Sequence, residues 1–253
     1  MSKFKNIFFI GLILILGSYS VADTVSLFEN SVVSNEIDFI TEDSTTIGHS
    51  LHFLGRVRAE MPDKRSDDLF DADSFHFKIS FKDETSINVF SHSSFGSRKK
   101  AEKYVIKLLG PLGKLPVYMR DRLSHVVIHK GNETAFSDHL GHFFVVYSEN
   151  MDIRIGNHDL EETVFHESVH ATLDYLFSDN EQWLNAQRLD CCFVTDYAKS
   201  HPMGEDLAET SLFAYAYFRY PDQLPKNVKI WLETKIPNRL SFFRDQIFES
   251  YLR

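Results

Sequence analysis

Cysteine is scarce in this chain, with only the neighbours Cys191 and Cys192 among 253 residues. Structural zinc sites are usually closed by four protein ligands, often cysteines, so two adjacent cysteines do not suggest such a site. Adjacent cysteines pair with each other only through a strained eight-membered ring, and we therefore expect them to be free, buried or linked to another molecule. A cysteine nucleophile needs a base beside it, and because the sequence shows no clear one, we assign them no catalytic role.

Long apolar runs are also missing. The run from Ile7 to Leu16 is shorter than the apolar stretch of about 20 residues that a membrane-spanning helix needs. Two lysines precede it, and the small residues Ser20-Val21-Ala22 follow at the positions that a signal peptidase reads. We therefore expect residues 1–22 to be a cleaved signal peptide, which predicts a secreted or periplasmic protein without a membrane contact. An uncleaved N-terminal anchor is the alternative.

Positive charge is in deficit. The chain has 27 Lys and Arg against 36 Asp and Glu, and its formal net charge of −9 becomes −11 once Lys3 and Lys5 leave with the signal peptide. An acidic chain without a basic run argues against nucleic acid and against an anionic membrane surface as partners. The remaining composition, 43% hydrophobic and 25% charged, is that of an ordinary globular protein with one sizeable core.

What the chain does contain is the motif His166-Glu167-x-x-His170, inside a stretch from Asp159 to Phe177 whose pattern predicts one helix. Asp159 is a suitable N-cap, and Glu162 three residues later completes a capping box. Apolar residues recur at helical spacing along the stretch, at positions 164, 169, 173, 176 and 177.

On such a helix His166 and His170 lie one turn apart on the same face, so both imidazoles can reach one metal ion. Glu167 is then placed to deprotonate a water molecule at the metal. This pattern is typical of a zinc hydrolase. The alternative is an accidental match in a chain with 12 histidines, but an accident has no reason to fall within a helix, behind a capping box.

Two histidines need a third ligand from a second element. Glu205 is our prediction, because it begins a helical pattern that runs to Tyr220 and shares a face with Glu209. Two carboxylates on an otherwise apolar helix face are costly unless a metal or a hydrogen-bond donor receives them. Glu209 can then accept the second N–H of a ligating histidine and orient it. The alternative is two exposed acids in a first helical turn, where the helix dipole favours them.

The order of the predicted elements, strands early and helices late, indicates an α+β fold. Residues 23–74 are expected to form an N-terminal extension, partly loop, that includes the charged stretch Met61 to Asp73. Alternating apolar residues from Phe75 to Val89 predict a β-hairpin, and a helix from Ser97 to Leu109 is expected to end at Gly110-Pro111. Short strands are expected at residues 123–128 and 143–147, with a weaker one at 153–155.

The motif and the residues after it resemble a known family. HESVHATLDY, from His166 to Tyr175, is similar to the active-site helix of thermolysin-like metallopeptidases. The later stretch from Tyr197 through GEDLAET resembles gluzincins of the anthrax lethal factor type, in which a helix beginning E-x-x-A-E supplies a glutamate ligand and an upstream tyrosine points at the metal. The resemblance covers residues 159–218, and its interval of 35 residues between His170 and Glu205 is longer than in thermolysin-like enzymes.

The resemblance implies a zincin-like domain over residues 75–253, with a small twisted sheet, an active-site helix and a C-terminal helical half. It implies His166, His170 and Glu205 as zinc ligands, Glu167 as general base and Tyr197 as the hydroxyl that steadies the oxyanion. For Tyr197 a core or rim aromatic is the alternative. In such enzymes an edge strand beside the active-site helix can pair with an extended peptide. The histidines at positions 129, 139 and 142 are not expected as ligands.

The expected function is hydrolysis of peptide bonds in a peptide or protein substrate, with Zn2+ as the cofactor. A peptidase-like zinc-binding protein that holds a peptide or protein partner without cleaving it is the alternative. A structural protein with an accidental motif is the third possibility.

Overall fold

The computed structural model describes residues 25–32, 40 and 48–248. The expected signal peptide, residues 1–22, lies outside the described residues, as does part of the expected N-terminal extension. Within the described part of the chain, no helix combines the length and the hydrophobicity that crossing a membrane requires.

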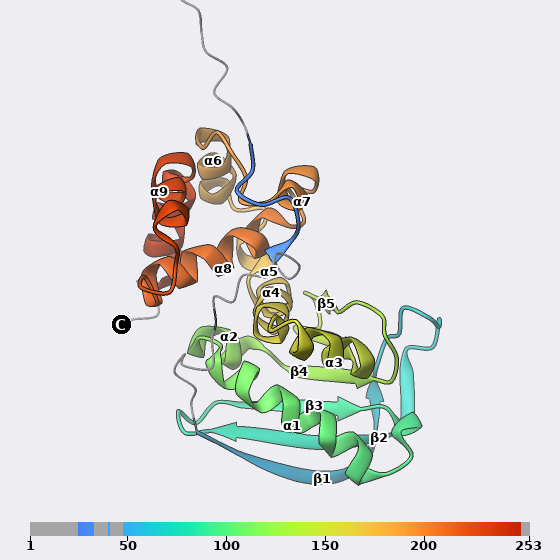
Figure 1. Cartoon of the computed structure of the whole chain (residues 1–253). Helices are drawn as coiled ribbons and strands as arrows, with labels where there is room; N and C mark the ends of the chain where they lie inside the picture. Colours follow the sequence, from blue (N-terminus) through green and yellow to red (C-terminus); the bar gives the residue numbers. More distant parts are fainter. Residues whose placement is uncertain (1–24, 33–39, 41–47, 249–253) are drawn as a thin grey trace, which may run out of the picture.

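The protein has a mixed α/β fold around one six-stranded sheet (Figure 1). The strand order is β1-β2-β3-β4-β6-β5. The pairs β3–β4 and β4–β6 are parallel, and the other three neighbouring pairs are antiparallel. The strands are β1 His49–Glu60, β2 Phe70–Phe81, β3 Ser86–Ser91, β4 His125–His129, β5 Phe136–Asp138 and β6 Phe143–Tyr147.

The two central parallel strands are buried on both faces. In β4, Val126 and Ile128 belong to the main core, whereas Val127 between them belongs to a second, smaller cluster. Strand β6 alternates in the same way, because successive side chains of a strand point to opposite faces of the sheet. The smaller cluster is completed by Ala59 and Met61 from the end of β1, so the far end of the β1–β2 hairpin folds over the second face of the sheet.

Helices cover the other face. The first helices are α1 Arg98–Lys114, α2 Val117–Arg122, α3 Ser148–Gly156 and α4 Leu160–Thr172, and Figure 1 shows α1 running across the sheet. The later helices form a helical half beyond α4, namely α5 Asp174–Phe177, α6 Glu181–Leu189, α7 Asp196–Ser200, α8 Asp206–Arg219, α9 Lys226–Lys235 and α10 Pro237–Phe242. Helix α4 contacts both α1 and α8, so it joins the sheet half to the helical half.

The hairpin predicted from Phe75 to Val89 is confirmed, because β2 and β3 pair antiparallel and bury Phe75, Phe77 and Ile79. The boundary set between residues 74 and 75 is crossed by β2, which begins at Phe70. Strand β1, from the expected extension, pairs with β2 along its length. The alternation of apolar and polar residues in β1 is weak because Ala59 is its only buried side chain. A strand is recognised in a sequence by this alternation, which requires one buried face.

Three local predictions are wrong. The strand expected at residues 153–155 lies in α3. Gly110-Pro111 does not end α1, which continues to Lys114 with Pro111 buried inside it. Cys191 and Cys192 are joined to each other by a disulfide, and the described part of the chain holds no free cysteine. In each case a short pattern or a local rule was outweighed by packing in the folded chain.

Candidate metal centre

Helix α4, which carries the histidine motif, begins where the sequence predicts but for a different reason. Asp159 is its N-cap residue, yet its side chain makes no capping hydrogen bond. Its carboxylate instead pairs with Arg154 at 3.0 Å. Glu162, the expected partner in a capping box, is fully buried and accepts a hydrogen bond from the backbone N–H of Ile40 at 2.9 Å. Tertiary partners therefore replace the local box.

The predicted single helix from Asp159 to Phe177 is divided in two at Leu173, between α4 and α5. The break falls after both histidines, so His166 and His170 still lie one turn apart on the same helix. Their rings cross at 80°, and the two Nε2 atoms are 3.1 Å apart. The Nε2 atoms of the two imidazoles thus face the same point.

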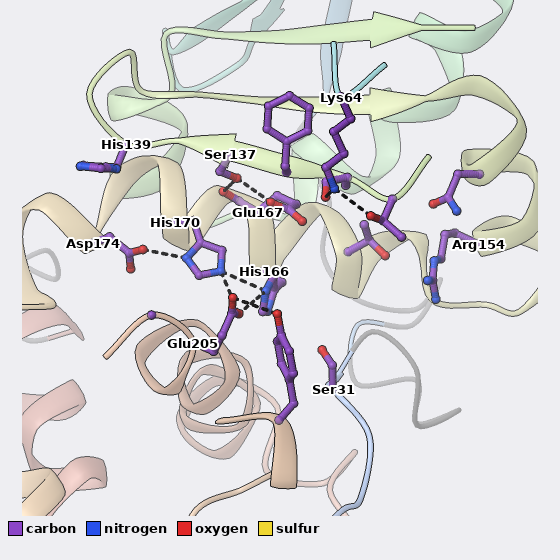
Figure 2. Close-up of a pocket in the computed structure, with 17 residues that line it drawn as sticks. Ser31, Lys64, Ser137, His139, Arg154, His166, Glu167, His170, Asp174 and Glu205 are labelled. Carbon is purple, nitrogen blue, oxygen red and sulfur yellow. Dashed lines mark hydrogen bonds and ion pairs between the residues drawn. The ribbon is translucent and has the colours of Figure 1, made fainter. Parts of the chain in front are cut away.

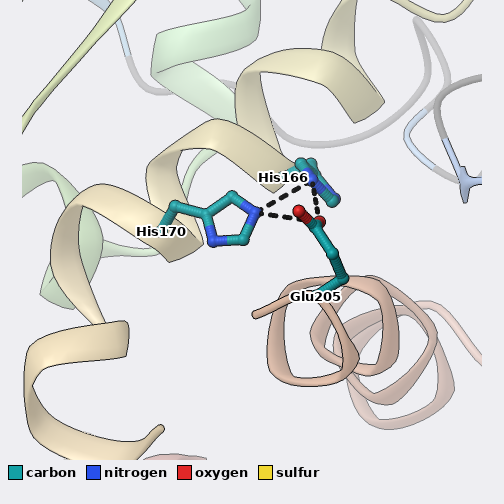
Figure 3. Close-up of side chains that lie close together, drawn as sticks. All are labelled: His166, His170 and Glu205. Carbon is teal, nitrogen blue, oxygen red and sulfur yellow. Dashed lines mark hydrogen bonds and ion pairs between the residues drawn. The ribbon is translucent and has the colours of Figure 1, made fainter. Parts of the chain in front are cut away.

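Glu205 reaches that point from the other half of the molecule (Figure 3). It is the N-cap residue of α8, and α8 packs against α4. Its Oε2 lies 3.4 Å from Nε2 of His166 and 3.3 Å from Nε2 of His170. The structure therefore brings together the three side chains that the sequence singled out as ligands, across an interval of 35 residues.

The three donor atoms fit a tetrahedral metal ion. Atoms that lie about 2.0–2.1 Å from a tetrahedral zinc are roughly 3.3 Å from one another. The observed edges of 3.1, 3.3 and 3.4 Å match that triangle. Oε2 of Glu205 is buried, and no described residue forms a hydrogen bond with it. A buried carboxylate oxygen facing two imidazole nitrogens is the donor set that a cation satisfies.

The electrostatics of the site also favour positive charge. Burial alone would lower the pKa of His170, but the hydrogen bond to Asp174 and the contact with the Glu205 carboxylate outweigh it and raise that pKa well above its ordinary value. Burial would raise the pKa of Glu205, and its contacts with His166 and His170 instead hold it far below the ordinary range. The first shift means that the surrounding carboxylates favour positive charge at this point, and the second means that Glu205 is held in its anionic form.

Asp174 is a site residue that the sequence patterns did not assign. Its Oδ2 lies 2.7 Å from Nδ1 of His170, four residues before it. A ligating histidine commonly donates its other N–H to a carboxylate, which fixes the tautomer and the ring orientation. The signal was present in the sequence as an i, i+4 spacing that crosses the break between α4 and α5.

Replacing Asp174 by Asn should weaken zinc binding about 10–100-fold, because a neutral amide orients and polarises the His170 ring less well than a carboxylate. The measurement is a zinc titration against a competing chelator. Asp179→Asn, an exposed change just after α5, is the matched control and should bind zinc as the wild type does. Equal affinities in the two variants would show that Asp174 does not support the ligand.

Glu209 lies behind His166. Its Oε1 is 3.6 Å from Nδ1 of His166, which is beyond ordinary hydrogen-bond length. The fully buried Glu209 carboxylate instead accepts hydrogen bonds from the Ser31 hydroxyl, the Val32 backbone N–H at 2.9 Å and the Thr195 hydroxyl at 2.9 Å. The segment around Ser31 therefore braces the rear of the site, a contact for which the sequence carried no signal.

Glu167 points to the open side of α4. Its Oε2 accepts a 2.6 Å hydrogen bond from Ser137, whose hydroxyl also lies 2.8 Å from the backbone carbonyl of Glu167. Ser137 is the middle residue of β5, the strand at the end of the sheet order. Edge strand and helix are thus fastened together at the residue expected to act as general base.

Tyr197 lies beside the third ligand. Its hydroxyl donates to Oε1 of Glu205 at 3.0 Å, and its side chain is 38% exposed, which excludes the core alternative and leaves it on the rim of the site. Burial and the neighbouring Glu205 charge raise the pKa of Tyr197 to about 12, so the hydroxyl remains a proton donor at neutral pH.

The three clustered side chains, Glu167, Asp174, Ser137 and Tyr197 line one cleft of about 530 Å³ (Figure 2), whereas Glu209 lies outside its lining. His139 lines the cleft, but it is not among the three clustered ligands. His129 lies near Asp63, and His142 contacts the backbone carbonyl of Ala171. Among the described residues, the only group of three or more potential ligands with this spacing is His166, His170 and Glu205.

Comparisons with protein-family models, with curated proteins and with solved structures found no match to this chain. The geometry of the cleft therefore carries the functional conclusion.

Proposed function

We propose that this chain is a zinc-dependent peptidase with the HExxH arrangement of the gluzincins. The observation that carries the proposal is the triangle of His166, His170 and Glu205, with edges of 3.1–3.4 Å and with Glu167 beside it in an open cleft. Three protein ligands in a cleft leave a coordination place for water, which is typical of catalytic rather than structural zinc sites.

A zincin-like fold is part of the same proposal, and it is supported by β5 lying beside the helix that carries both histidines. Strand β5 pairs with β6 on one side only, so an extended peptide can add to its other side through backbone hydrogen bonds. The secreted or periplasmic location, which depends on residues 1–22, also remains a prediction.

Zinc, when bound by these ligands, lowers the pKa of a water molecule from about 15.7 toward roughly 7 and polarises the carbonyl of the scissile bond. Glu167 takes the proton from the attacking water and passes it to the leaving amine. Ser137 holds the Glu167 carboxylate toward the cleft through its 2.6 Å hydrogen bond. Tyr197, with its hydroxyl beside Glu205, donates to the oxyanion that develops on the carbonyl oxygen when water attacks the carbonyl carbon.

The proposal is tested first by zinc content. The purified wild-type protein is expected to hold one zinc per chain by elemental analysis, and Glu205→Ala is expected to hold far less, because two histidines alone bind the ion weakly. Glu181→Ala, an exposed change at the start of α6, is the control and should keep its zinc. Wild-type protein without zinc, and with a stability that EDTA does not change, would exclude a zinc site.

Activity is tested next with a mixed peptide library. Zinc-loaded wild-type protein is expected to cleave peptides, and removal of zinc with a chelator is expected to abolish cleavage. A protein that binds zinc stoichiometrically and cleaves no peptide would instead be a zinc-binding protein that holds a peptide or protein partner.

A further inference from the structure

One wall of the cleft carries positive charge, although the chain as a whole is acidic. Lys64 and Arg154 line the same cleft as His166 and Glu167. Figure 2 shows both cations at the end of the cleft opposite His139 and Asp174. The neutral side chains of Asn150, Thr134 and Thr163 line this cleft as well.

Lys64 is mounted firmly at this wall. It lies between β1 and β2, in the hairpin end that folds over the sheet, and its backbone N–H donates to the hydroxyl of Tyr147 at 3.0 Å. Tyr147 is 1% exposed and its hydroxyl also donates to Asp63 at 3.1 Å, so the turn is fastened to the end of β6. The sequence indicated only a charged loop here, because these contacts join residues about 84 positions apart.

The ammonium group of Lys64 has neutral partners. Its Nζ donates to Thr134 Oγ1 at 2.8 Å and to the backbone carbonyl of Ala135 at 3.2 Å. No carboxylate of a described residue forms an ion pair with it, whereas the neighbouring Arg154 is paired with Asp159 at 3.0 Å. The ammonium group also lies 5.3 Å from the centre of the Phe136 ring, which is a neutral partner as well. A lysine has three N–H donors, so one donor and a positive charge that no carboxylate of the described residues neutralises face the cleft.

The position of Lys64 along the cleft sets its distance from the reacting bond. Its acceptor Ala135 is two residues before Ser137, which holds the general base Glu167. Two residues of extended chain span about 7 Å. A peptide that lies along β5 therefore brings a residue one or two positions from the scissile bond to the ammonium group.

We propose that the cleft selects peptides that carry a carboxylate one or two residues from the cleaved bond, and that Lys64 is the residue that determines this specificity. The proposal rests on the peptidase function proposed above. An aspartate or glutamate side chain and the terminal carboxylate of a short peptide present the same chemistry to Lys64.

The test compares matched peptides on zinc-loaded protein. Peptides with Glu are expected to be cleaved with roughly tenfold higher kcat/KM than the same peptides with Gln, at one of the two positions on the Lys64 side. Peptides with a free and with an amidated C-terminus form the second arm, which separates the terminal carboxylate from the side chain. Lys64→Met is expected to lose the preference, and Lys99→Met, an exposed change on α1, is expected to keep it.

Equal kcat/KM for the carboxylate and amide peptides in the wild type, or an unchanged preference in Lys64→Met, would overturn the proposal. Fluorescence anisotropy of the same labelled peptides measures their binding without cleavage, so the carboxylate site and the peptidase function are tested separately. If no peptide is cleaved, the peptidase function fails, and tighter binding of the acidic peptides that is lost in Lys64→Met would still support the carboxylate site. Zinc content is expected to stay at the wild-type value in Lys64→Met.

Discussion

Glu167→Gln is expected to lower the rate of peptide hydrolysis by a factor on the order of 10² or more, while the protein keeps its zinc. The Glu167 carboxylate follows the proposed ligand His166 on α4 and is fastened toward the cleft by a hydrogen bond from Ser137. A glutamine has nearly the same shape and can still accept that bond, but it cannot take a proton from water.

The measurements are kcat/KM on a peptide that the wild type cleaves and elemental analysis of the same samples. Glu181→Gln, an exposed change of the same chemistry, is the control and should retain full activity. Undiminished hydrolysis by a zinc-loaded Glu167→Gln variant would remove Glu167 from the mechanism, and loss of zinc in that variant would show that its role is structural.

Arg239→Met is expected to reduce the free energy of unfolding by about 3–5 kcal/mol. Arg239 is fully buried and joins two carboxylates: Nη1 contacts both oxygens of Asp206 at 2.7 and 2.9 Å, and Nε contacts Asp190 at 3.2 Å. It also donates to the backbone carbonyl of Cys192. Methionine fills a similar volume but leaves two buried carboxylates without their cation, which is far costlier than the loss of a surface charge.

Urea denaturation of the variant measures this loss, and Arg188→Met on the exposed face of α6 should change stability by less than about 0.5 kcal/mol.

Burial raises the pKa of Asp206, and the charge of Arg239 opposes that rise. Without Arg239 the pKa of Asp206 rises further, and a protein that holds a carboxyl with a raised folded-state pKa loses stability as pH increases through that pKa. The deficit should therefore be larger at neutral pH and shrink as pH falls toward about 3.9, the ordinary Asp value. A deficit that does not change with pH would point to packing alone.

This buried ion network lies next to the proposed metal centre. Asp206, held by Arg239 from the start of α10, is the first residue of α8 and directly follows Glu205, the proposed third ligand. Gln187 from α6 donates to the same carboxylate at 2.9 Å. Three helices of the C-terminal half thus fix the end of α8 from which Glu205 projects.

The sequence located the parts of the site that depend on helical periodicity. His166, Glu167 and His170 lie on one helix as predicted, and the helix begins at the predicted residue. The predicted capping box does not form at that start. Asp159 pairs with Arg154 instead, and Glu162 accepts a hydrogen bond from the backbone N–H of Ile40. A local hydrogen bond competes with every tertiary partner of similar strength, and only the packed chain decides between them.

Cys191 and Cys192 illustrate the same limit. Ring strain argued that they do not pair with each other, yet they form a disulfide in the segment between α6 and α7. Distant residues hold this segment in place. The backbone carbonyl of Cys192 accepts a hydrogen bond from Arg239, and that of Val194 accepts one from the backbone N–H of Phe28. Contacts from residues far away in the chain therefore set a backbone that local rules disfavour.

By itself, the sequence determined which residues local helix spacing relates: the histidine pair with its adjacent glutamate on α4, and Glu205 with Glu209 at the start of α8. Only the tertiary structure decided that Glu205 meets both imidazoles, that Ser137 and Asp174 hold Glu167 and His170, and that Lys64 enters the cleft from the β1–β2 hairpin. Helix and strand periods act over a few residues, whereas most of these contacts depend on how buried faces pack across intervals of up to 70 residues.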